Sequence, residues 1–268
     1  MLYIVGTPIG NLEDITFRQI RILSEVDLIA AEDTRHSRKL MNYFEIKTPL
    51  TSYHEYTSEN KTNHLIEQMK SGKSVAIISD SGMPVISDPG FEIVKACHEN
   101  NIPVTTVPGA TAFVSGLVMS GFNPDSFVFL GFLSKKQKKD ISFLSKEGKT
   151  TIIYESPHKL QRTLELFNEK LNPLRKVAIA REITKLYEQV LRMTIQEACE
   201  YYQKNKPMGE YVIILEGEEI EEEKSDLPIA SQVEEYIAKG MAKKDAIKQV
   251  AKDMRLAKND VYKEVTND

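Results

Sequence analysis

The sequence has little of what stabilises secreted proteins and nothing that would span a membrane. Its two cysteines, Cys97 and Cys199, lie far apart and form no CxxC pair, which fits a reducing compartment better than a disulfide framework. No apolar run approaches the roughly 20 residues that cross a bilayer. Met1 is followed by Leu-Tyr-Ile-Val without a basic segment, so no secretory signal peptide is expected. These absences predict a cytoplasmic protein without a membrane anchor.

Metal-binding patterns and a strong basic excess are also missing. The five histidines are scattered without metal-ligand spacing, so no metal site is expected. The net charge of −4 excludes a protein that coats nucleic acid wholesale but allows a local basic patch. With 268 residues, 41% of them apolar and 28% charged, the chain is an ordinary globular protein long enough for two compact domains.

Two familiar phosphate-binding motifs are absent where they would be sought. Residues 6–11, Gly-Thr-Pro-Ile-Gly-Asn, stand where a Rossmann fingerprint would begin, but Pro8 takes its middle glycine position and has no N–H for a pyrophosphate. The segment Gly72-Lys73-Ser74 is no P-loop, because Glu67 replaces the leading glycine. The loop at residues 6–11 is therefore poorly suited to a phosphate-bearing cofactor. A cofactor without phosphate, such as S-adenosylmethionine, can be lined by a turn of proline and apolar side chains. The alternative is a plain strand-to-helix turn.

What the sequence does have is an alternation of short β-branched runs with helical stretches. This pattern is typical of α/β proteins with mainly parallel sheets. Strands are predicted over residues 2–5, 27–31, 75–79, 104–107, 127–132, 151–154, 177–180 and 211–215, with helices between them, for example over 35–44, 63–70 and 160–171. Turn residues at 121–125 separate the two sets of strands. We therefore predict α/β domains over 1–118 and 119–217.

The end of the chain differs in composition. Residues 218–225 form a predicted acidic linker, and 226–268 a small helix-turn-helix-like tail with helices over 229–238, 243–254 and 260–265. From Lys239 to Lys263 there are eight basic residues against three acidic ones. This excess suits contact with phosphates, and a solvated helical tail is the alternative.

Two further loops follow predicted strands and are rich in glycine, proline and small residues. Residues 80–90, Asp-Ser-Gly-Met-Pro-Val-Ile-Ser-Asp-Pro-Gly, follow the strand 75–79, and residues 108–112, Pro-Gly-Ala-Thr-Ala, follow the strand 104–107. Ligands of open α/β sheets bind beyond the carboxyl ends of the strands, and small residues let a ligand approach the backbone closely. Each loop alone is weak evidence, because turns need glycine and proline anyway.

Five motifs stand in one order along the chain: Gly-Thr-Pro-Ile-Gly-Asn-Leu at 6–12, Ala-Glu-Asp-Thr-Arg at 31–35, Ser-Asp-Ser-Gly-Met-Pro with Ser-Asp-Pro-Gly at 79–90, Tyr-Glu-Ser-Pro-His at 154–158, and Ala-Arg-Glu-Ile-Thr-Lys at 180–185. In this arrangement the chain resembles the ribosomal RNA small subunit methyltransferase I family of the tetrapyrrole methylase superfamily. The resemblance covers about residues 1–217 and, more loosely, the tail. Met83 stands where threonine is usual, and residues 108–112 vary a Pro-Gly-Pro-Ser-Ala-like loop.

The resemblance implies a two-domain enzyme that binds S-adenosylmethionine in the cleft between its domains and is usually a homodimer. The implied reaction is 2′-O-methylation of a cytidine ribose in 16S ribosomal RNA, at the peptidyl site of the decoding centre, on the small subunit or a late precursor. Carried over by motif, the cofactor contacts are Pro8, Ile9, Gly82, Met83, Ile86, Thr111, Ala112, Glu155, Arg181 and Glu210.

The reaction needs a positioned acceptor and help with its proton. The sulfonium already activates the methyl group, so holding the ribose oxygen in place is a large part of catalysis, and a general base or a cation should assist. Asp33 and Glu155 are the predicted proton acceptors, and Lys185 is predicted to support the site. The alternatives are a helix cap for Asp33 and a surface pair with Glu182 for Lys185.

A compact basic cluster lies between the predicted strands of the second domain. Lys135, Lys136, Lys138 and Lys139, together with Arg35, are predicted to contact RNA phosphates, and a solvated loop is the alternative for the cluster. Two other functions remain open: a small-molecule tetrapyrrole methyltransferase and a non-catalytic ribosome-binding factor.

Overall fold

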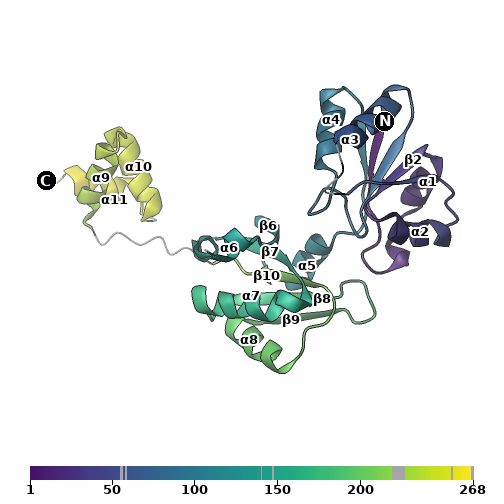
Figure 1. The fold of residues 1–268 in the computed structure, drawn as a ribbon. Helices are drawn as coiled ribbons and strands as arrows, with labels where there is room; N and C mark the ends of the chain where they lie inside the picture. Colours follow the sequence, from purple (N-terminus) through teal and green to yellow (C-terminus); the bar gives the residue numbers. More distant parts are fainter. Residues whose placement is uncertain are drawn as a thin grey trace. The chain divides into compact units, whose positions relative to one another are not determined.

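The computed structural model describes residues 1–54, 57, 59–139, 141–146, 148–218, 227–254 and 256–266. The chain divides into two compact units, Met1–Glu218 and Glu219–Asp268. The first unit contains two five-stranded sheets with helices, and the second contains three helices (Figure 1). The predicted fold class, two consecutive α/β parts followed by a small helical part, is confirmed. Apart from Glu218, the predicted acidic linker lies outside the described residues.

The first sheet is entirely parallel. Its strand order is β3-β2-β4-β1-β5, and its strands are β1 (Leu2–Val5), β2 (Leu28–Ala31), β3 (Leu50–Ser52), β4 (Val75–Ile78) and β5 (Val104–Val107). The four neighbouring pairs all run in the same direction. The carboxyl ends of these strands therefore share one edge, and the loops that follow them meet there.

Two helices cover each face of the first sheet. α1 (Phe17–Glu25) and α2 (Thr34–Tyr43) place buried side chains such as Leu23 and Met41 on one face. α3 (Glu59–Lys70) and α4 (Phe91–Glu99) cover the other, where Cys97 is fully buried. A short 3-10 turn, η1 (Leu12–Asp14), precedes α1.

The second sheet is mixed, which corrects the prediction of mainly parallel sheets. Its order is β6-β7-β10-β8-β9, and its strands are β6 (Phe127–Phe132), β7 (Thr150–Glu155), β8 (Lys176–Arg181), β9 (Gln189–Thr194) and β10 (Tyr211–Leu215). Only β6 and β7 pair in parallel, while the other three pairs are antiparallel. For the β8–β9 pair the reason is local, because residues 182–188 are too few for the crossover that a parallel pair requires.

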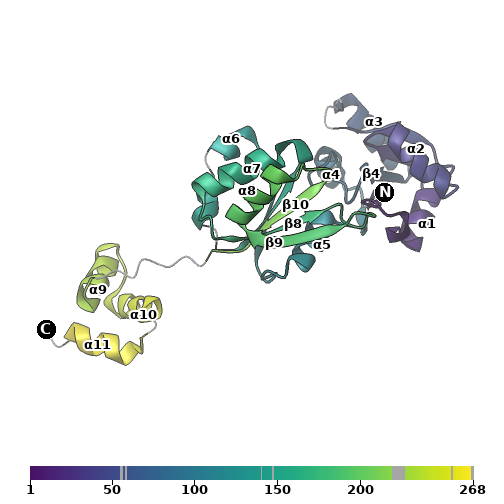
Figure 2. The same cartoon turned by 90° about the horizontal axis from the view of Figure 1, so that it is seen from below.

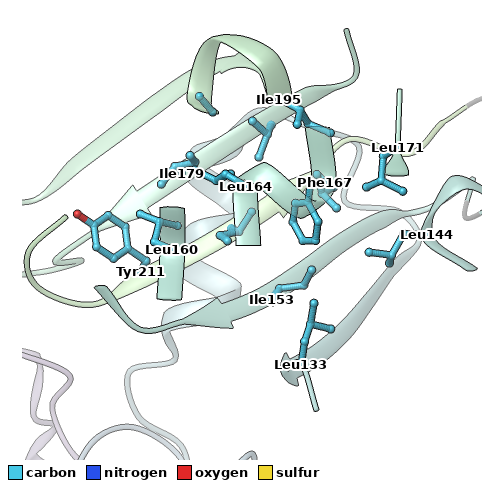
Figure 3. Packing of buried hydrophobic residues seen from close by; sticks show 14 of the residues in the cluster. Leu133, Leu144, Ile153, Leu160, Leu164, Phe167, Leu171, Ile179, Ile195 and Tyr211 are labelled. Atoms are coloured by element: carbon cyan, nitrogen blue, oxygen red, sulfur yellow. The ribbon is translucent and has the colours of Figure 1, made fainter. Parts of the chain in front are cut away.

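Both faces of the second sheet are covered. α7 (Pro157–Lys170) and α8 (Ile195–Lys204) cover one face, where Leu160, Leu164, Phe167 and Ile195 pack on Ile153 and Ile179 (Figure 3). α6 (Lys135–Lys139) and η2 (Ser142–Lys146) lie between β6 and β7 in the chain.

α5 (Ala112–Ser120) covers the opposite face of the second sheet, as Figure 2 shows. It packs closely there, because a Cβ added to Gly116 would lie 3.2 Å from Val212 Cγ1. The predicted domain boundary near residue 118 therefore falls inside a helix that packs with the second sheet, and the elements of the first sheet end with β5.

The second unit has a core of its own. α9 (Ile229–Ala238), α10 (Lys243–Asp253) and α11 (Lys258–Thr266) bury Val233, Ile247, Val250 and Val261. The three helices predicted for the tail are thus present. Within the ranges that the structure describes, no helix is both long and apolar enough to cross a membrane.

Candidate active site

The loops after β1, β4 and β5 are fixed to one another by backbone contacts that need glycine. The Thr7 N–H donates to Gly82 O at 2.9 Å, and the Gly82 N–H donates back to Thr7 O at 3.1 Å. A Cβ added to Gly6 would lie 2.9 Å from Gly109 Cα, closer than side chains approach. The buried Gln19 amide donates to Gly6 O at 2.8 Å. The three loops therefore form one rigid wall at the carboxyl edge of the first sheet.

A cavity of about 430 Å³ lies against this wall, and we call it the first cavity. Eight of the ten predicted cofactor contacts line it: Ile9, Gly82, Met83, Ile86, Thr111, Ala112, Glu155 and Glu210. Its remaining lining includes Ser81, Ser87, Asp88, Phe132, Tyr154, Ser156, Pro157, Ile183, Tyr211 and Val212. Pro8 and Arg181 are not part of it. Residues from both sheets and their loops thus contribute to one site.

The chemistry of the first cavity suits an organic cation. Its described lining contains three carboxylates, Asp88, Glu155 and Glu210, and no lysine, arginine or histidine. Apolar side chains such as Ile9, Met83 and Val212 supply most of the rest. Dinucleotide phosphates would find no cationic side chain here, whereas a sulfonium compound with an adenosine group fits both the acidic and the apolar parts.

Asp88 is the functional candidate that the sequence analysis missed. Burial raises the pKa of the Asp88 carboxyl to about 6. The nearby carboxylates of Glu32 and Asp80 also raise this pKa, and a hydrogen bond with Ser79 lowers it. Its loop is strained, since the preceding residues Val85 and Ser87 have φ of 77° and 63°, values that non-glycine residues rarely adopt. A signal was present in the sequence: an aspartate within a glycine-rich loop directly after a buried strand.

Glu155 lines the first cavity, but its carboxylate is already occupied. Its Oε2 accepts hydrogen bonds from Thr163 Oγ1 at 2.6 Å and from the Lys138 ammonium, and its Oε1 accepts the Ser156 N–H at 2.9 Å. The side chain is 2% exposed. This arrangement is that of a buried structural ion pair, so it does not support the predicted role of Glu155 as proton acceptor.

The same contact involves one of the predicted RNA contacts. Lys138 points inward, where its ammonium bonds to Glu155 and, at 2.7 Å, to Thr163 Oγ1. These bonds favour a structural role for Lys138, and its contact with RNA stays a prediction. Its neighbours Lys135, Lys136 and Lys139 are exposed on α6.

Asp33 lies at the start of α2 and caps it, as the alternative interpretation held. Its Oδ1 accepts the Arg35 N–H at 2.8 Å, and its Oδ2 pairs with the Arg35 guanidinium at 2.9 Å. Hydrogen bonds from the Arg35 side chain and backbone lower the pKa of Asp33 to about 2. Asp33 lines neither cavity described here, and at this pKa it is a weak base.

Lys185 is held between two carboxylates. Its Nζ lies 2.9 Å from Glu182 Oε1 and 2.8 Å from Glu210 Oε2. Burial lowers the pKa of Lys185, but the hydrogen bonds to Glu210 and Glu182 outweigh it and the net shift is upward. Lys185 is therefore a fixed cation. Arg181, at the end of β8, has a buried Nε without a partner among the described residues.

A second cavity, also of about 430 Å³, adjoins the first. The two cavities share the lining residues Ile9, Ser81 and Glu210. The rest of the second cavity is lined by Thr7, Pro8, Gly10, Leu12, His36, Ser37, Lys39, Leu40, Tyr43, Ser79, Asp80 and Lys185. It therefore contains the predicted residues Pro8 and Lys185, and it differs from the first cavity in having basic side chains.

Comparisons with known proteins point to one family. The pattern of the tetrapyrrole (corrin/porphyrin) methylases matches residues 1–199. A "Ribosomal RNA small subunit methyltransferase I" of Bacillus subtilis (strain 168) is 45% identical over 271 residues, with 98% of this chain and 92% of the relative covered. A protein of the same name from Halalkalibacterium halodurans is 47% identical, covering 97% and 93%. Another, from Thermotoga maritima, is 46% identical over 220 residues, covering 81% and 99%.

Solved structures share the fold at lower identity. A uroporphyrin-III C-methyltransferase from Thermus thermophilus aligns with a TM-score of 0.55 at 20% identity, covering 80% of this chain and 93% of that one. A cobalt precorrin-4 methyltransferase aligns with a TM-score of 0.61 at 17% identity, covering 80% and 94%. These likenesses concern the fold of the two α/β parts.

Proposed function

We infer the reaction from one premise: this chain belongs to the tetrapyrrole methylase family and, within it, to the ribosomal RNA small subunit methyltransferase I family. The membership confirms the predicted class of enzyme, a methyltransferase, and S-adenosylmethionine as its methyl donor. The first cavity fits that donor, because it offers carboxylates and apolar walls without a cationic side chain among its described residues.

We propose that the protein methylates the 2′-oxygen of a cytidine ribose in 16S ribosomal RNA, at the peptidyl site of the decoding centre. The name of the relatives supports the small-subunit RNA as substrate, and the sugar, base and position come from the motif resemblance. We further propose that the enzyme acts on the small subunit or a late precursor, in the cytoplasm, as a homodimer.

The first cavity is proposed as the donor site. Ile9, Met83 and Ile86 would pack on the donor, and the Asp88 and Glu210 carboxylates face the space that its positive charge would share. When bound, S-adenosylmethionine supplies a methyl group that its sulfonium has already activated. The chain then has to hold the acceptor oxygen in line and take up one proton.

Asp88 is proposed as the group that accepts this proton. A carboxyl with a pKa of about 6 is ionised at neutral pH and is a stronger base than an exposed aspartate. Of the other two carboxylates in the first cavity, Glu155 is bonded to Lys138 and Glu210 to Lys185. Asp88 thus takes the role that motif membership alone had suggested for Asp33 or Glu155.

The test incubates the purified protein with methyl-labelled donor and unmodified 30S subunits. Nuclease digestion and mass spectrometry then locate the new methyl group. We expect one methyl on the ribose of a 16S cytidine and none on uroporphyrinogen offered as the competing acceptor. A methyl found on a base, or on the tetrapyrrole alone, would contradict the proposal, and an unmethylated subunit with tight binding would favour a ribosome-binding factor.

A further inference from the structure

We propose that the second cavity binds the acceptor nucleotide of the RNA, with its phosphates on α2 and its base beside Tyr43 and Asp80. The inference rests on the proposed function, which it deepens by naming the site that holds the substrate.

The position of the second cavity suits an acceptor. Ile9, Ser81 and Glu210 line both cavities. The two cavities are therefore neighbours, and ligands bound in them would lie side by side. Methyl transfer requires the acceptor oxygen and the methyl carbon to come within about 3–3.5 Å. A nucleotide in the second cavity, with its ribose beside Ile9, Ser81 and Glu210, would lie next to the donor site.

α2 brings basic side chains to the second cavity, whose lining also includes the carboxylates of Asp80 and Glu210. The helix carries Arg35, His36, Arg38 and Lys39 and has no acidic residue from Thr34 to Tyr43. His36, Lys39, Leu40 and Tyr43 are spaced so that they share one face of the helix, and all four line the cavity. Cationic side chains on a fixed helix are typical contacts for nucleic-acid phosphates.

Ser37 provides a separate indication of a polar ligand. This residue is 2% exposed and lines the second cavity, and its Oγ has no hydrogen-bond partner among the described residues. A buried hydroxyl without a partner is costly. A polar group of a nucleotide bound in this cavity would give the hydroxyl a partner.

Two residues suit recognition of a base. The Tyr43 ring is 65% exposed at the rim of the cavity, and exposed rings of this kind stack on unpaired bases. The Asp80 carboxylate also lines the cavity, and its Oδ1 accepts the Asp33 N–H at 3.2 Å. An ionised carboxylate only accepts hydrogen bonds, so it pairs with the exocyclic amino group of cytosine and not with the carbonyl oxygen of uracil.

Binding of unmodified 30S subunits tests the assignment without requiring methyl transfer. We expect Tyr43→Ala and Lys39→Ala to raise the dissociation constant for 30S subunits about tenfold and fivefold, in line with stacking and phosphate contacts. Donor affinity by calorimetry should stay within about twofold, because neither side chain lines the first cavity. Lys95→Ala, an exposed lysine of α4 on the opposite face of the sheet, is the matched control. Both variants binding like this control would overturn the assignment.

Base choice supplies the second readout. Asp80→Asn keeps an oxygen for the Asp33 N–H but adds an amide donor, so we expect the preference for cytidine over uridine at the acceptor position to fall at least tenfold. An unchanged preference would remove Asp80 from the site. Methylation by the wild-type protein is scored separately, so a wrong reaction and a wrong nucleotide site give different results.

Discussion

At the scale of single residues, surroundings decide what each carboxylate of the first cavity can do. Glu155 has three donors and is almost fully buried, and Glu210 is bonded to Lys185. Burial and two neighbouring carboxylates disfavour the charged form of Asp88 and raise its pKa. The motifs located Glu155 correctly at the cavity, but sequence spacing could not reveal that Lys138, seventeen positions earlier, would occupy it. The sequence does not show which side chains of other elements bond to a given carboxylate, and this decided the role of Glu155.

Replacing Asp88 by asparagine should remove the proton acceptor and leave the donor site in place. We expect kcat to fall about 10²- to 10⁴-fold, the usual range for a lost general base, and donor affinity to fall by a smaller factor because Asp88 also lines the donor site. In the wild-type enzyme kcat should rise with pH around the pKa of about 6 and then level off, and this rise should disappear in Asp88→Asn. A variant that keeps the rise would exclude Asp88.

The same substitution should stabilise the protein above pH 6. The folded-state pKa of Asp88, about 6, lies above its ordinary value of 3.8, so the folded state binds this proton more tightly and its stability falls as pH rises from about 4 to 6. Asparagine has no charge to bury. We expect Asp88→Asn to raise the free energy of unfolding by about 1–2 kcal/mol at pH 8 and by almost nothing near pH 4. Urea unfolding at both pH values measures the difference.

Breaking the ion pair between Lys138 and Glu155 should cost stability. Glu155→Gln removes the negative charge beside the Lys138 ammonium and leaves one acceptor oxygen for three donors, and Lys138→Ala leaves a buried carboxylate short of one donor. We expect a loss of about 2–3 kcal/mol for each in urea unfolding, below the usual 3–5 because Lys138 is partly exposed. The neighbour Lys139→Ala, exposed on α6, should change stability by less than about 0.5 kcal/mol. Equal effects for Lys138 and Lys139 would contradict the inward placement.

At the scale of elements, the loop between β4 and α4 stores strain beside the first cavity. Gly82 has φ of 84° and Ser87 has φ of 63°, so opposite substitutions should have opposite effects. Ser87→Gly should stabilise by about 1 kcal/mol because glycine adopts this region freely. Gly82→Ala should destabilise by about 1 kcal/mol or more, and its new Cβ would lie 3.3 Å from Ile9 Cγ2. Thermal unfolding checks both signs, and donor calorimetry should show weaker binding for Gly82→Ala.

Strand positions could be predicted from the sequence better than strand directions. The runs 2–5, 104–107, 127–132 and 211–215 matched β1, β5, β6 and β10, because each is rich in β-branched, aromatic or other apolar residues. β3 was missed because it is three residues long and partly exposed, and β9 because its burial is only partial along its length. The short link between β8 and β9 is a local signal, but the direction of β10 depends on its pairing between β7 and β8, and such long-range pairing leaves no local signature.

At the scale of the whole molecule, the two compact units have separate cores. The Thermotoga maritima relative is covered to 99% while matching only 81% of this chain, a shortfall that the second unit would account for. The sequence predicted three helices in this tail from their apolar spacing and left its role open between phosphate contact and a solvated tail. The basic excess from Lys239 to Lys263 favours phosphate contact.

Removing the second unit should therefore affect the substrate and not the donor. A chain of residues 1–218 is expected to keep the donor affinity and melting temperature of its α/β parts. Its affinity for 30S subunits should fall about tenfold, with a shallower dependence on salt, because fewer phosphates are neutralised. An unchanged affinity and salt slope would identify the tail as a solvated appendage.

The two free thiols are buried in different halves of the α/β unit. The reactivity of each thiol therefore measures local opening of its own half. Cys97 is fully enclosed beside β1 and β4, and Cys199 lies in α8 on the second sheet. Burial raises the pKa of Cys97 to about 11 and that of Cys199 upward as well. Alkylating reagents attack the thiolate, so at neutral pH they should modify neither sulfur until its surroundings open. Peptide mapping of a timed alkylation would then show which of the two cysteines is modified first, and so which half opens more readily. It would also show whether a ligand in the first cavity lowers both alkylation rates.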